Sequence, residues 1–526
     1  MSKSLKNSFI KGALILAIAN IITKIIGAFF KIPLANLIGD DGMGIFNSAY
    51  QIYIFMFIIA TSGFPVAISK MVAENVARNN THEVKKIFRI SLIVLLIIGG
   101  IGTSVMFFAS SWLASTLSNS RASYAILGIA PAVVYVAVMS AFRGYFQGMQ
   151  NMTPTAISGV LEALGKLLIG YILAKSLMPS GVEFAAAGAV YGVVCGAAAG
   201  MIVLFITYLF RKRERIMGHA RPSSSIFKEL LFLTVPITLS ACISSITSLI
   251  DTFTIQNRLQ QIVGVTETAA SSLYGAYSGF VIPIFQLPVT VIQPLAICLV
   301  PAIASAIAQN HKNNAKVVVE NCLRFTFILG LACTIGFAIT ANGILRTIYT
   351  SPSDITVTLL QILAPSTLFI SLLQVTTGTL QAYGKTKLPV IYMAIGGAVK
   401  LILNYTLIPV YGITIVPIAT DICYFIIISL SLVSVFRVAE LAPRWNALVL
   451  RPLMANIVLA IVAFGIQSIL ISNAFPLKGA TILTIIAAAF AYFISIFAFK
   501  AITAEDIYML PHGEKILPVL KKLRLV

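Results

Sequence analysis

The chain has 526 residues, 58% of them hydrophobic and only 10% charged, with a mean hydropathy of +0.96. A soluble domain carries about 25% charged residues, so this composition excludes a soluble globular protein. The net charge of +20 would suit nucleic acid, but membrane topology accounts for its distribution. The 6 cysteines are scattered through apolar runs, which predicts small buried side chains and no metal site.

Apolar runs of about 20 residues, enough to cross a bilayer as a helix, recur along the chain. We therefore predict an all-α polytopic membrane protein of about fourteen transmembrane helices. The first run is too long for the apolar core of a signal peptide, and we expect it to be retained as a span. The predicted spans are 10–34, 44–69, 87–109, 122–147, 154–178, 184–210, 229–256, 273–304, 322–345, 355–382, 388–409, 412–436, 452–473 and 479–501.

The orientation follows from the 37 Lys and Arg residues. If the N-terminus is cytoplasmic, most of them fall in cytoplasmic connections or at their flanks. The five on the outer side are Arg121, Lys175, Arg258, Arg346 and Lys478. Cytoplasmic loops carry an excess of Lys and Arg, so we predict a cell-membrane protein with both termini in the cytoplasm.

The sequence also repeats. Adding 234 to the residue number takes Pro131 to Pro365 and Lys166 to Lys400. The other matching pairs are Gly144 and Gly378, Gln147 and Gln381, Leu167 and Leu401, and Tyr171 and Tyr405. The repeat predicts two six-helix bundles related by a pseudo-two-fold axis along the membrane normal, with a cleft between them. The predicted domains are the bundles 1–225 and 226–440, followed by two extra helices and a cytoplasmic tail, 441–526.

Charges inside spans need a reason, because each costs about 2.5–3.5 kcal/mol at the bilayer centre on insertion scales. Asn20, Lys24, Gly27 and Lys31 share one face of the first span, since they are spaced by four, three and four residues. We predict that this cationic face lines a hydrated cavity and binds an anion. The alternative for Lys31 is that its ammonium reaches the outer interface.

Three further spans carry charges. Glu162 and Lys166 have the spacing of a helical ion pair, which could serve the substrate cavity or the structure alone. Asp251 stands alone in its span, so we expect it to pair with a Lys from another helix. Lys400 is the repeat equivalent of Lys166 and has Asn404 one turn on; a bridge between Asp251 and Lys400 is one hypothesis.

Three motifs resemble those of a known group. They are GFPVAISKMVAE at 63–74, RGYFQGMQNMTP at 143–154 and LVPAI at 299–303. They are similar to signatures of the stage V sporulation protein B and MurJ-type lipid II flippases, in the multidrug/oligosaccharidyl-lipid/polysaccharide (MOP) exporter superfamily. The resemblance extends over nearly the whole chain.

The resemblance implies outward translocation of the undecaprenyl-pyrophosphate-linked peptidoglycan precursor by alternating access, for cell wall or spore cortex, with no enzymatic step. It implies a cavity lined by basic residues of helices 1, 2 and 8, and a lipid groove at helices 13 and 14. Lys24 matches a family Arg. The second and eighth spans here carry no central Arg or Lys, so part of the family's cationic set is missing.

The resemblance also bears on ion coupling. Some relatives bind Na⁺ between helices 7, 11 and 12, where Asp251, Asn404 and Thr420 have comparable places in this chain. The ammonium of Lys400 would be a substitute for that ion. Coupling to Na⁺, to protons or to the membrane potential stays open, and no other cofactor is expected.

Other functions stay open as well. The nearest alternative is a flippase for another lipid-linked oligosaccharide. A cation-coupled multidrug exporter would need acidic cavity residues, and a membrane enzyme would need paired carboxylates near a large loop. The adjacent acids are Asp40 with Asp41 and Glu505 with Asp506, in a short turn and the tail. The expected partners are a lipid-linked oligosaccharide, membrane lipids and other cell-wall synthesis proteins, and no nucleic acid.

Overall fold

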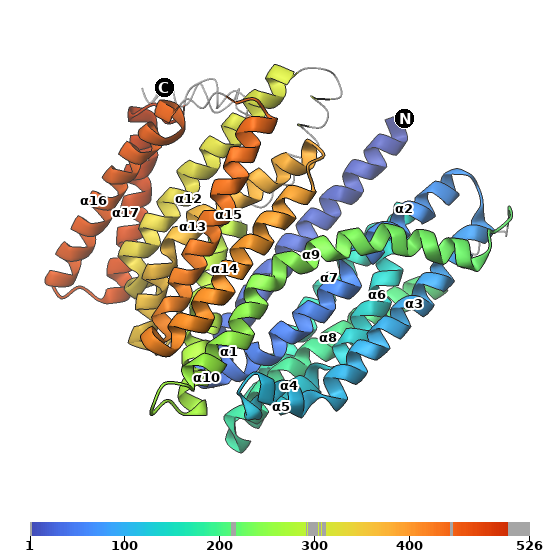
Figure 1. Cartoon of the computed structure of the whole chain (residues 1–526), viewed down its shortest axis with the longest axis horizontal. Helices are drawn as coiled ribbons and strands as arrows, with labels where there is room; N and C mark the ends of the chain where they lie inside the picture. The colour runs from blue at the N-terminus through green and yellow to red at the C-terminus, as the bar shows by residue number, and fades with distance from the viewer. Residues whose placement is uncertain are drawn as a thin grey trace. The chain divides into compact units, whose positions relative to one another are not determined.

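The computed structural model describes residues 3–211, 217–290, 312–441 and 445–502, with single residues 292, 303 and 307. The regular elements among them are all helical (Figure 1), since a helix in lipid satisfies its own backbone hydrogen bonds. The chain divides into two compact units, Met1–Gly279 and Phe280–Val526, and each is described by itself. Most of the motif 299–303, the end of the predicted span 273–304 and nearly all of the C-terminal tail lie outside the described residues.

The helices of the first unit follow the predicted spans. They are α1 (Lys3–Thr61), α2 (Phe64–Ala77), α3 (Thr81–Phe108), α4 (Ser110–Thr116), α5 (Ser123–Ile129), α6 (Pro131–Gly148), α7 (Thr153–Leu177), α8 (Val182–Leu209), α9 (Ser223–Leu259) and α10 (Glu267–Gly275). Short 3₁₀ turns, η1 (Ser120–Ala122) and η2 (Met178–Ser180), precede α5 and α8, and a π-helical stretch, η3 (Ala276–Val281), follows α10.

The second unit contains the remaining described helices. They are α12 (Lys312–Ile348), α13 (Asp354–Ala382), α14 (Lys387–Tyr411), η4 (Gly412–Thr414), α15 (Ile415–Val438), η5 (Asn446–Leu450), α16 (Arg451–Ser472) and α17 (Leu477–Ala498). The two C-terminal helices pack on α12. Tyr492 Oη donates to the Ile328 carbonyl at 2.8 Å and accepts from Asn456 Nδ2 at 3.0 Å, so a buried polar chain ties α17 to α12 and α16.

Helix α1 reverses direction at Gly39. This residue has φ +66° and ψ −172°, a non-helical conformation that glycine adopts at little steric cost. In a straight helix Phe30 and Phe46 would lie roughly 24 Å apart, at about 1.5 Å per residue. Their ring centroids are 6.0 Å apart. The two halves of α1 therefore form a hairpin, which corresponds to the first two predicted spans.

The helix ends repeat along the chain. Adding 234 to the bounds of α7, Thr153–Leu177, gives Lys387–Tyr411, the bounds of α14. The same shift takes η2 to η4 and Gly148, the last residue of α6, to Ala382, the last residue of α13. Helices thus begin and end at the shift that the sequence repeat predicts. The boundary predicted at 225/226 follows this repeat and stays a prediction; the first compact unit extends to Gly279, because α9 and α10 pack on α1.

Ten stretches of the described residues are long and apolar enough to cross a membrane. Two of them, Ile18–Ala77 with 60 residues and Lys387–Val438 with 52, have room for two crossings each at about 20 residues per crossing. In addition, α9 covers the predicted span 229–256 with 37 helical residues. The prediction of an all-α polytopic membrane protein is confirmed.

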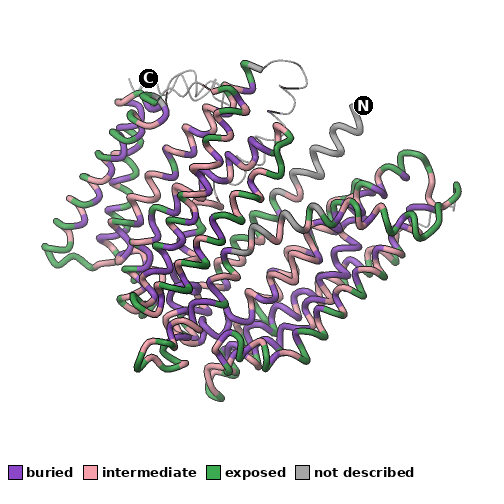
Figure 2. Tube along the Cα trace, viewed as in Figure 1, coloured by how far each residue is buried: buried purple, intermediate pink, exposed green. Residues whose placement is uncertain are grey.

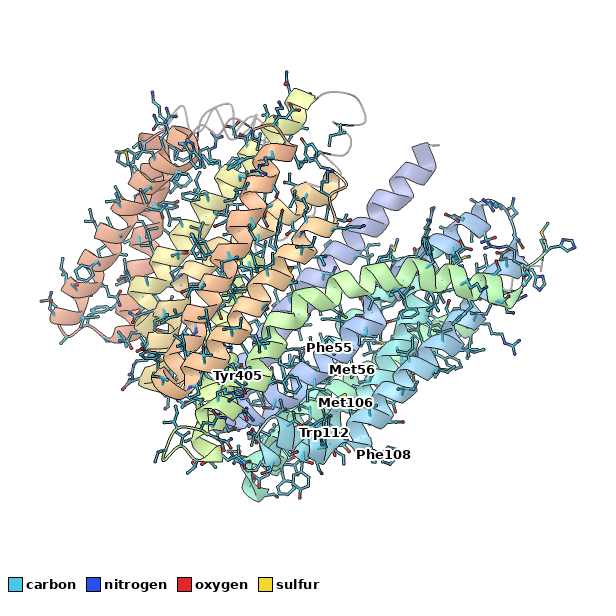
Figure 3. All side chains as sticks on the ribbon, in the orientation of Figure 1. Phe55, Met56, Met106, Phe108, Trp112 and Tyr405 are labelled. Carbon is cyan, nitrogen blue, oxygen red and sulfur yellow. The ribbon has the colours of Figure 1, made fainter. Side chains whose placement is uncertain are left out.

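Large apolar side chains lie on the outside of both units, and Figure 2 shows exposed residues along the helices. Phe108 is 85% exposed and Trp112 is 66% exposed, and Figure 3 places them close together where α3 ends and α4 begins. In the second unit, Phe464 is 67% exposed. Large exposed apolar surfaces mark sites of contact with a membrane or a partner, and in a chain with this many apolar spans we assign these outer surfaces to lipid.

Helices α7 and α8 approach each other more closely than ordinary side chains allow. Gly188, Gly192, Gly196 and Gly200 recur every four residues on α8. A Cβ built on Gly192 would lie 2.3 Å from the backbone of Gly170 on α7. Small residues at this spacing let membrane helices pack backbone to backbone. This close packing fixes the helix pair that carries the charged residues described next.

Candidate functional site

A cavity of about 390 Å³ lies inside the first unit. Both halves of the α1 hairpin contribute to its wall, together with α6, α7 and α8. The polar residues that line it are Asn20, Thr23, Tyr50, Tyr53, Arg143, Thr155, Glu162 and Lys166. The hairpin at Gly39 is what brings Asn20 and Tyr50 to the same cavity.

Glu162, the acidic residue that lines the cavity, forms an ion pair with Arg143 on α6. Arg143 Nη2 donates to Glu162 Oε2 at 2.9 Å, and Arg143 Nε donates to Ser158 Oγ at 3.1 Å. The ion pair expected between Glu162 and Lys166 is therefore wrong as to the partner. Arg143 lies near the end of the predicted fourth span, 122–147, and has five N–H donors in a fixed fork, so it reaches the carboxylate and the hydroxyl together.

Lys166 contacts an aromatic residue. Its Nζ donates to Tyr50 Oη at 2.7 Å and lies 4.2 Å from the centroid of that ring. The Phe30 ring is 5.2 Å away. Lys31 Nζ also faces the Tyr50 ring, at 5.8 Å from its centroid. Aromatic faces attract cations, and Tyr50 thus holds two ammonium groups beside the cavity.

The cavity also contains polar atoms that the protein leaves unsatisfied. The Tyr53 hydroxyl and Thr155 Oγ1 are buried and have no hydrogen-bond partner within the described part of the chain. Buried polar groups normally find a partner, in protein or in water. A polar cavity of this size has room for water or for the polar part of a ligand.

The charge of the cluster is positive. Arg143 and Lys166 line the cavity with Glu162, and Lys31, which is not a lining residue, faces the Tyr50 ring. Three cations and one carboxylate leave a formal charge of two positive units. Interactions between charges strengthen as the effective dielectric constant falls below that of water, so the arrangement is suited to a polyanionic group.

The predicted cationic face of the first span is only partly in this cavity. Asn20 and Gly27 line it, and Lys31 is half-buried beside Tyr50. Lys24 is exposed and is not among the lining residues. It lies about 60° around the helix from Gly27, at about 100° per residue, and therefore at the margin of the lining face.

The other predicted site residues are buried in their own units. Asp251 on α9 is 8% exposed, in the first unit. In the second unit, Lys400 on α14 is 2% exposed, and Asn404 and Thr420 are also buried. The bridge between Asp251 and Lys400 and the ion site at Asp251, Asn404 and Thr420 stay predictions.

The sequence analysis did not single out Asp421, an acidic residue next to Thr420 in the second unit. Asp421 follows Thr420 on α15 and accepts a short hydrogen bond from Ser366 Oγ on α13. A carboxylate inside a predicted span is the signal that would have identified it. Tyr50 and Tyr53 were missed as well, because nothing in the sequence distinguishes them from ordinary interfacial aromatics.

A polar clasp joins α9 and α10 to the first helices at one end of the unit. Asn257 Nδ2 donates to Ser118 Oγ at 3.0 Å, and Gln260 Nε2 donates to the Ser118 carbonyl. Gln256 Nε2 donates to Ser48 Oγ at 2.9 Å. These bonds link the start of the predicted second bundle to the first.

An ion pair and a capped turn complete the clasp. Arg121 binds Asp41 in bidentate fashion, with N–O distances of 2.8 and 2.5 Å. Glu267 Oε1 accepts from the backbone N–H and hydroxyl of Ser120 at 2.8 and 2.7 Å. Three of the connections predicted to lie outside, those after the first, third and seventh spans, thus meet at one end of the unit.

At the opposite end, the segment that precedes α9 is held against the α2–α3 turn. Arg221 binds Glu83 at 2.5 Å and Glu229 at 2.8 Å. Hydrogen bonding to Glu83 raises the pKa of the Arg221 guanidinium. Asn80, the N-cap of α3, donates to the His219 carbonyl at 2.9 Å. These residues belong to connections predicted to face the cytoplasm.

Helical spans, a repeated helix register and charges buried inside the spans describe an all-α polytopic membrane protein, and the comparisons with known proteins assign it to the MOP type. The model of the polysaccharide biosynthesis protein family matches residues 9–307, and the MatE model matches residues 236–406. The first match covers more than half of the chain. The chain belongs to the polysaccharide biosynthesis protein family, within the MOP superfamily.

Known proteins agree with this membership. Stage V sporulation protein B of Bacillus subtilis (strain 168) is 31% identical over 351 residues, which are 66% of this chain and 68% of that protein. Lipid II flippase MurJ of the same organism is 24% identical over 426 residues, 77% of this chain and 78% of that one. A solved structure of lipid II flippase MurJ in an inward closed conformation matches with a TM-score of 0.68 at 15% identity, over 92% of this chain and 98% of that one. At that identity the structural match establishes the fold alone.

Proposed function

We propose that the protein is a flippase that moves an undecaprenyl-pyrophosphate-linked saccharide, the lipid II peptidoglycan precursor, from the inner to the outer face of the cell membrane. The observation that carries the proposal is the cationic cluster of Arg143, Glu162 and Lys166 in the cavity, with Lys31 beside it at the Tyr50 ring. A pyrophosphate is a polyanion, and a cluster with two excess positive charges complements it. One relative named above, a lipid II flippase, supports the class of substrate.

The membrane potential can drive transport through this cationic cluster. Moving a charge across the membrane changes the energy by about 2.3 kcal/mol per 100 mV. An inside-negative potential favours outward movement of a pyrophosphate, and it also favours inward return of the empty cationic site. No covalent bond has to change, so the proposal needs no catalytic residue.

The polar clasp supports alternating access between the bundles 1–225 and 226–440. It joins α9 and α10 to the α1 hairpin and to the α4–α5 connection at the end predicted to face outward. Opening an outward path between the bundles requires these contacts to separate. Apart from the buried bond between Gln256 and Ser48, these contacts are exposed or only partly buried, so water molecules can replace the partners when the contacts separate.

The test compares Lys166→Gln with Lys175→Gln in full-length protein reconstituted into liposomes. Both substitutions remove one cation from α7, but Lys175 is exposed and does not line the cavity. Hydrogen bonds to charged groups contribute about 1.5–3 kcal/mol, so we expect Lys166→Gln to slow lipid II translocation about tenfold or more. Lys175→Gln should transport as the parent does.

Equal translocation by the two variants would contradict the assignment of the cavity. The same liposomes distinguish substrates, because they can carry lipid II or another lipid-linked oligosaccharide. Preference for the second lipid would support a polysaccharide flippase instead. A cation-coupled multidrug exporter is disfavoured, because the acid that lines the cavity, Glu162, is paired with Arg143.

A further inference from the structure

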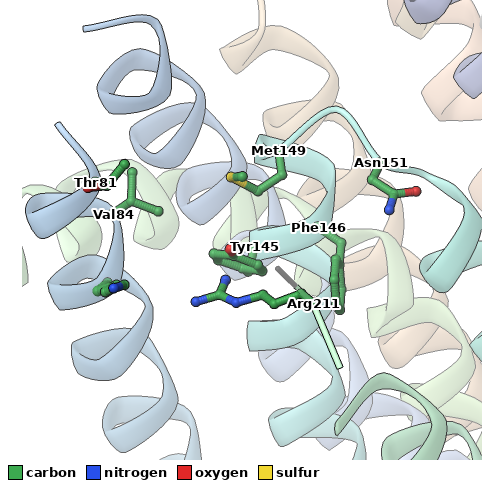
Figure 4. Close-up of a pocket in the computed structure, with 8 residues that line it drawn as sticks. Thr81, Val84, Tyr145, Phe146, Met149, Asn151 and Arg211 are labelled. Atoms are coloured by element: carbon green, nitrogen blue, oxygen red, sulfur yellow. The ribbon is translucent and has the colours of Figure 1, made fainter. Parts of the chain in front are cut away.

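A second cavity, of about 270 Å³, lies at the other end of the first unit from the polar clasp. It is lined by the start of α3, the end of α6, the turn that follows α6, and the residue that follows the last turn of α8. Figure 4 shows the Arg211 guanidinium next to the Tyr145 ring in the wall of this cavity. The lining residues are Thr81, Val84, Lys85, Tyr145, Phe146, Met149, Asn151 and Arg211, which we call the headgroup pocket.

Aromatic rings fix the Arg211 guanidinium. Its central carbon lies 4.1 Å from the centroid of the Tyr208 ring and 4.7 Å from that of Tyr145. Phe88 packs against both tyrosines, with ring centroids 4.7 and 5.1 Å apart. Stacking uses the flat face of a guanidinium, and Arg211 Nη2 also donates to Tyr208 Oη at 3.4 Å. The cation is therefore held in one orientation before any ligand arrives.

The chemistry of the wall selects an anion. Of the described residues that line the pocket, Lys85 and Arg211 are cationic and none is acidic. Thr81 and Asn151 add a hydroxyl and an amide, while Val84 and Met149 give the wall an apolar part. A planar guanidinium beside an ammonium is the usual protein arrangement for binding phosphate. We propose that the headgroup pocket binds the phosphate of an anionic phospholipid.

Position and size favour a lipid headgroup over a free phosphate ion. The pocket lies where helices α3, α6 and α8 meet polar connections, and those connections are predicted to face the cytoplasm. Its volume is just below the roughly 300–1,000 Å³ of pockets that bury a whole drug-sized ligand. It therefore accommodates a phosphate with its polar ester group while the acyl chains stay in the bilayer. Basic pockets between helices on the cytoplasmic side bind such headgroups.

A bound headgroup would also act on the segment that precedes α9. Thr81 Oγ1 accepts from the Met217 N–H at 2.8 Å, and Lys86 Nζ donates to the Arg221 carbonyl at 2.6 Å. The pocket thus adjoins the contacts that hold this segment to the start of α3. Phosphate binding would stabilise that contact and with it the position of α9.

The test is a lipid titration of purified full-length protein, followed by native mass spectrometry. The ligands are phosphatidylglycerol, phosphatidylcholine and inorganic phosphate. The pocket variant is Lys85→Gln with Arg211→Gln. Each Lys or Arg near an anionic lipid surface contributes about 1 kcal/mol, so we expect a roughly 30-fold weaker Kd for phosphatidylglycerol.

The matched control is Lys70→Gln with Arg78→Gln, which removes two exposed cations from the same end of the unit without touching the pocket. We expect its Kd to stay within about threefold of the parent. Equal weakening by the two double variants would overturn the proposal, because the binding would then be a general effect of surface charge. Inorganic phosphate or phosphatidylcholine binding as tightly as phosphatidylglycerol would overturn the choice of ligand.

If the double variant does not fold, the single substitution Lys85→Gln answers the same question. Lys85 is half-buried at the start of α3, and its loss should weaken phosphatidylglycerol binding about fivefold. An unchanged Kd in this folded variant would contradict the role of the pocket. The measurement does not depend on which substrate the protein transports, so its failure would leave the proposed flippase activity standing.

Discussion

At the residue scale, the cavity shows how a charge inside a membrane protein acquires its partner. Glu162 has Lys166 one turn away on its own helix, yet it binds Arg143 from α6. The helix spacing permits the local pair, but packing of α6 against α7 offers a forked donor that also reaches Ser158. Lys166 then takes the hydroxyl and the ring of Tyr50. Arg143 is thus paired with the carboxylate and Lys166 with the tyrosine.

Removing one member of the Arg143–Glu162 pair should destabilise the protein. Arg143→Gln leaves a largely buried carboxylate without its cation, and we expect the free energy of unfolding to fall by about 1–3 kcal/mol. The double variant Arg143→Gln/Glu162→Gln removes both charges and should recover most of that loss. Thermal unfolding in detergent gives the comparison. Strictly additive effects of the two substitutions would show that the pair is not coupled.

At the element scale, the sequence repeat relates helix ends that hydropathy locates one span at a time. Hydropathy locates apolar stretches, but it leaves each helix end uncertain by several residues. The 234-residue shift links two places in the chain, and the structure ends α7 and α14, and α6 and α13, at equivalent residues. The reversal of α1 at Gly39 is a local property as well, because a positive φ suits glycine.

A glycine-to-alanine substitution, which adds one methyl group, tests the close packing of the α8 glycines against α7. Gly192→Ala places a Cβ 2.3 Å from the Gly170 backbone. Overpacking costs about 1–3 kcal/mol, so the unfolding midpoint should fall. Gly100→Ala on α3 is the control, since a Cβ there meets nothing within 4 Å, and alanine has the higher helix propensity. An equal decrease in both variants would mean that the α7–α8 contact is not the cause.

At the scale of the whole molecule, alternating access predicts that the polar clasp must open during transport. Ser118→Cys with Asn257→Cys, in a background without the native cysteines, places two thiols where the parent side chains lie 3.0 Å apart. Oxidation should stop lipid translocation in liposomes, and a reductant should restore it. The disulfide would hold α9 to the α4–α5 connection and so block any movement between them.

The control crosslink stays inside the predicted first bundle. Ser111 and Ser123 have hydroxyl oxygens 3.4 Å apart on α4 and α5, so Ser111→Cys with Ser123→Cys forms a comparable bridge without joining the two bundles. Its oxidation should leave translocation unchanged. Full activity of the oxidised Ser118/Asn257 pair would contradict the need for the clasp to open.

The sequence by itself determined that this chain is an all-α membrane protein, because hydropathy and the cost of unpaired backbone groups in lipid depend only on local composition. It also determined the repeat, the relation to the MOP superfamily, and the presence of costly charges at Lys31, Glu162 and Lys166. Tertiary structure decided how those charges are paired. Arg143 and Tyr50 reach the cavity, and Lys31 reaches the Tyr50 ring, from segments that only the hairpin at Gly39 and the close α7–α8 contact bring together. No local pattern in the sequence records such distances.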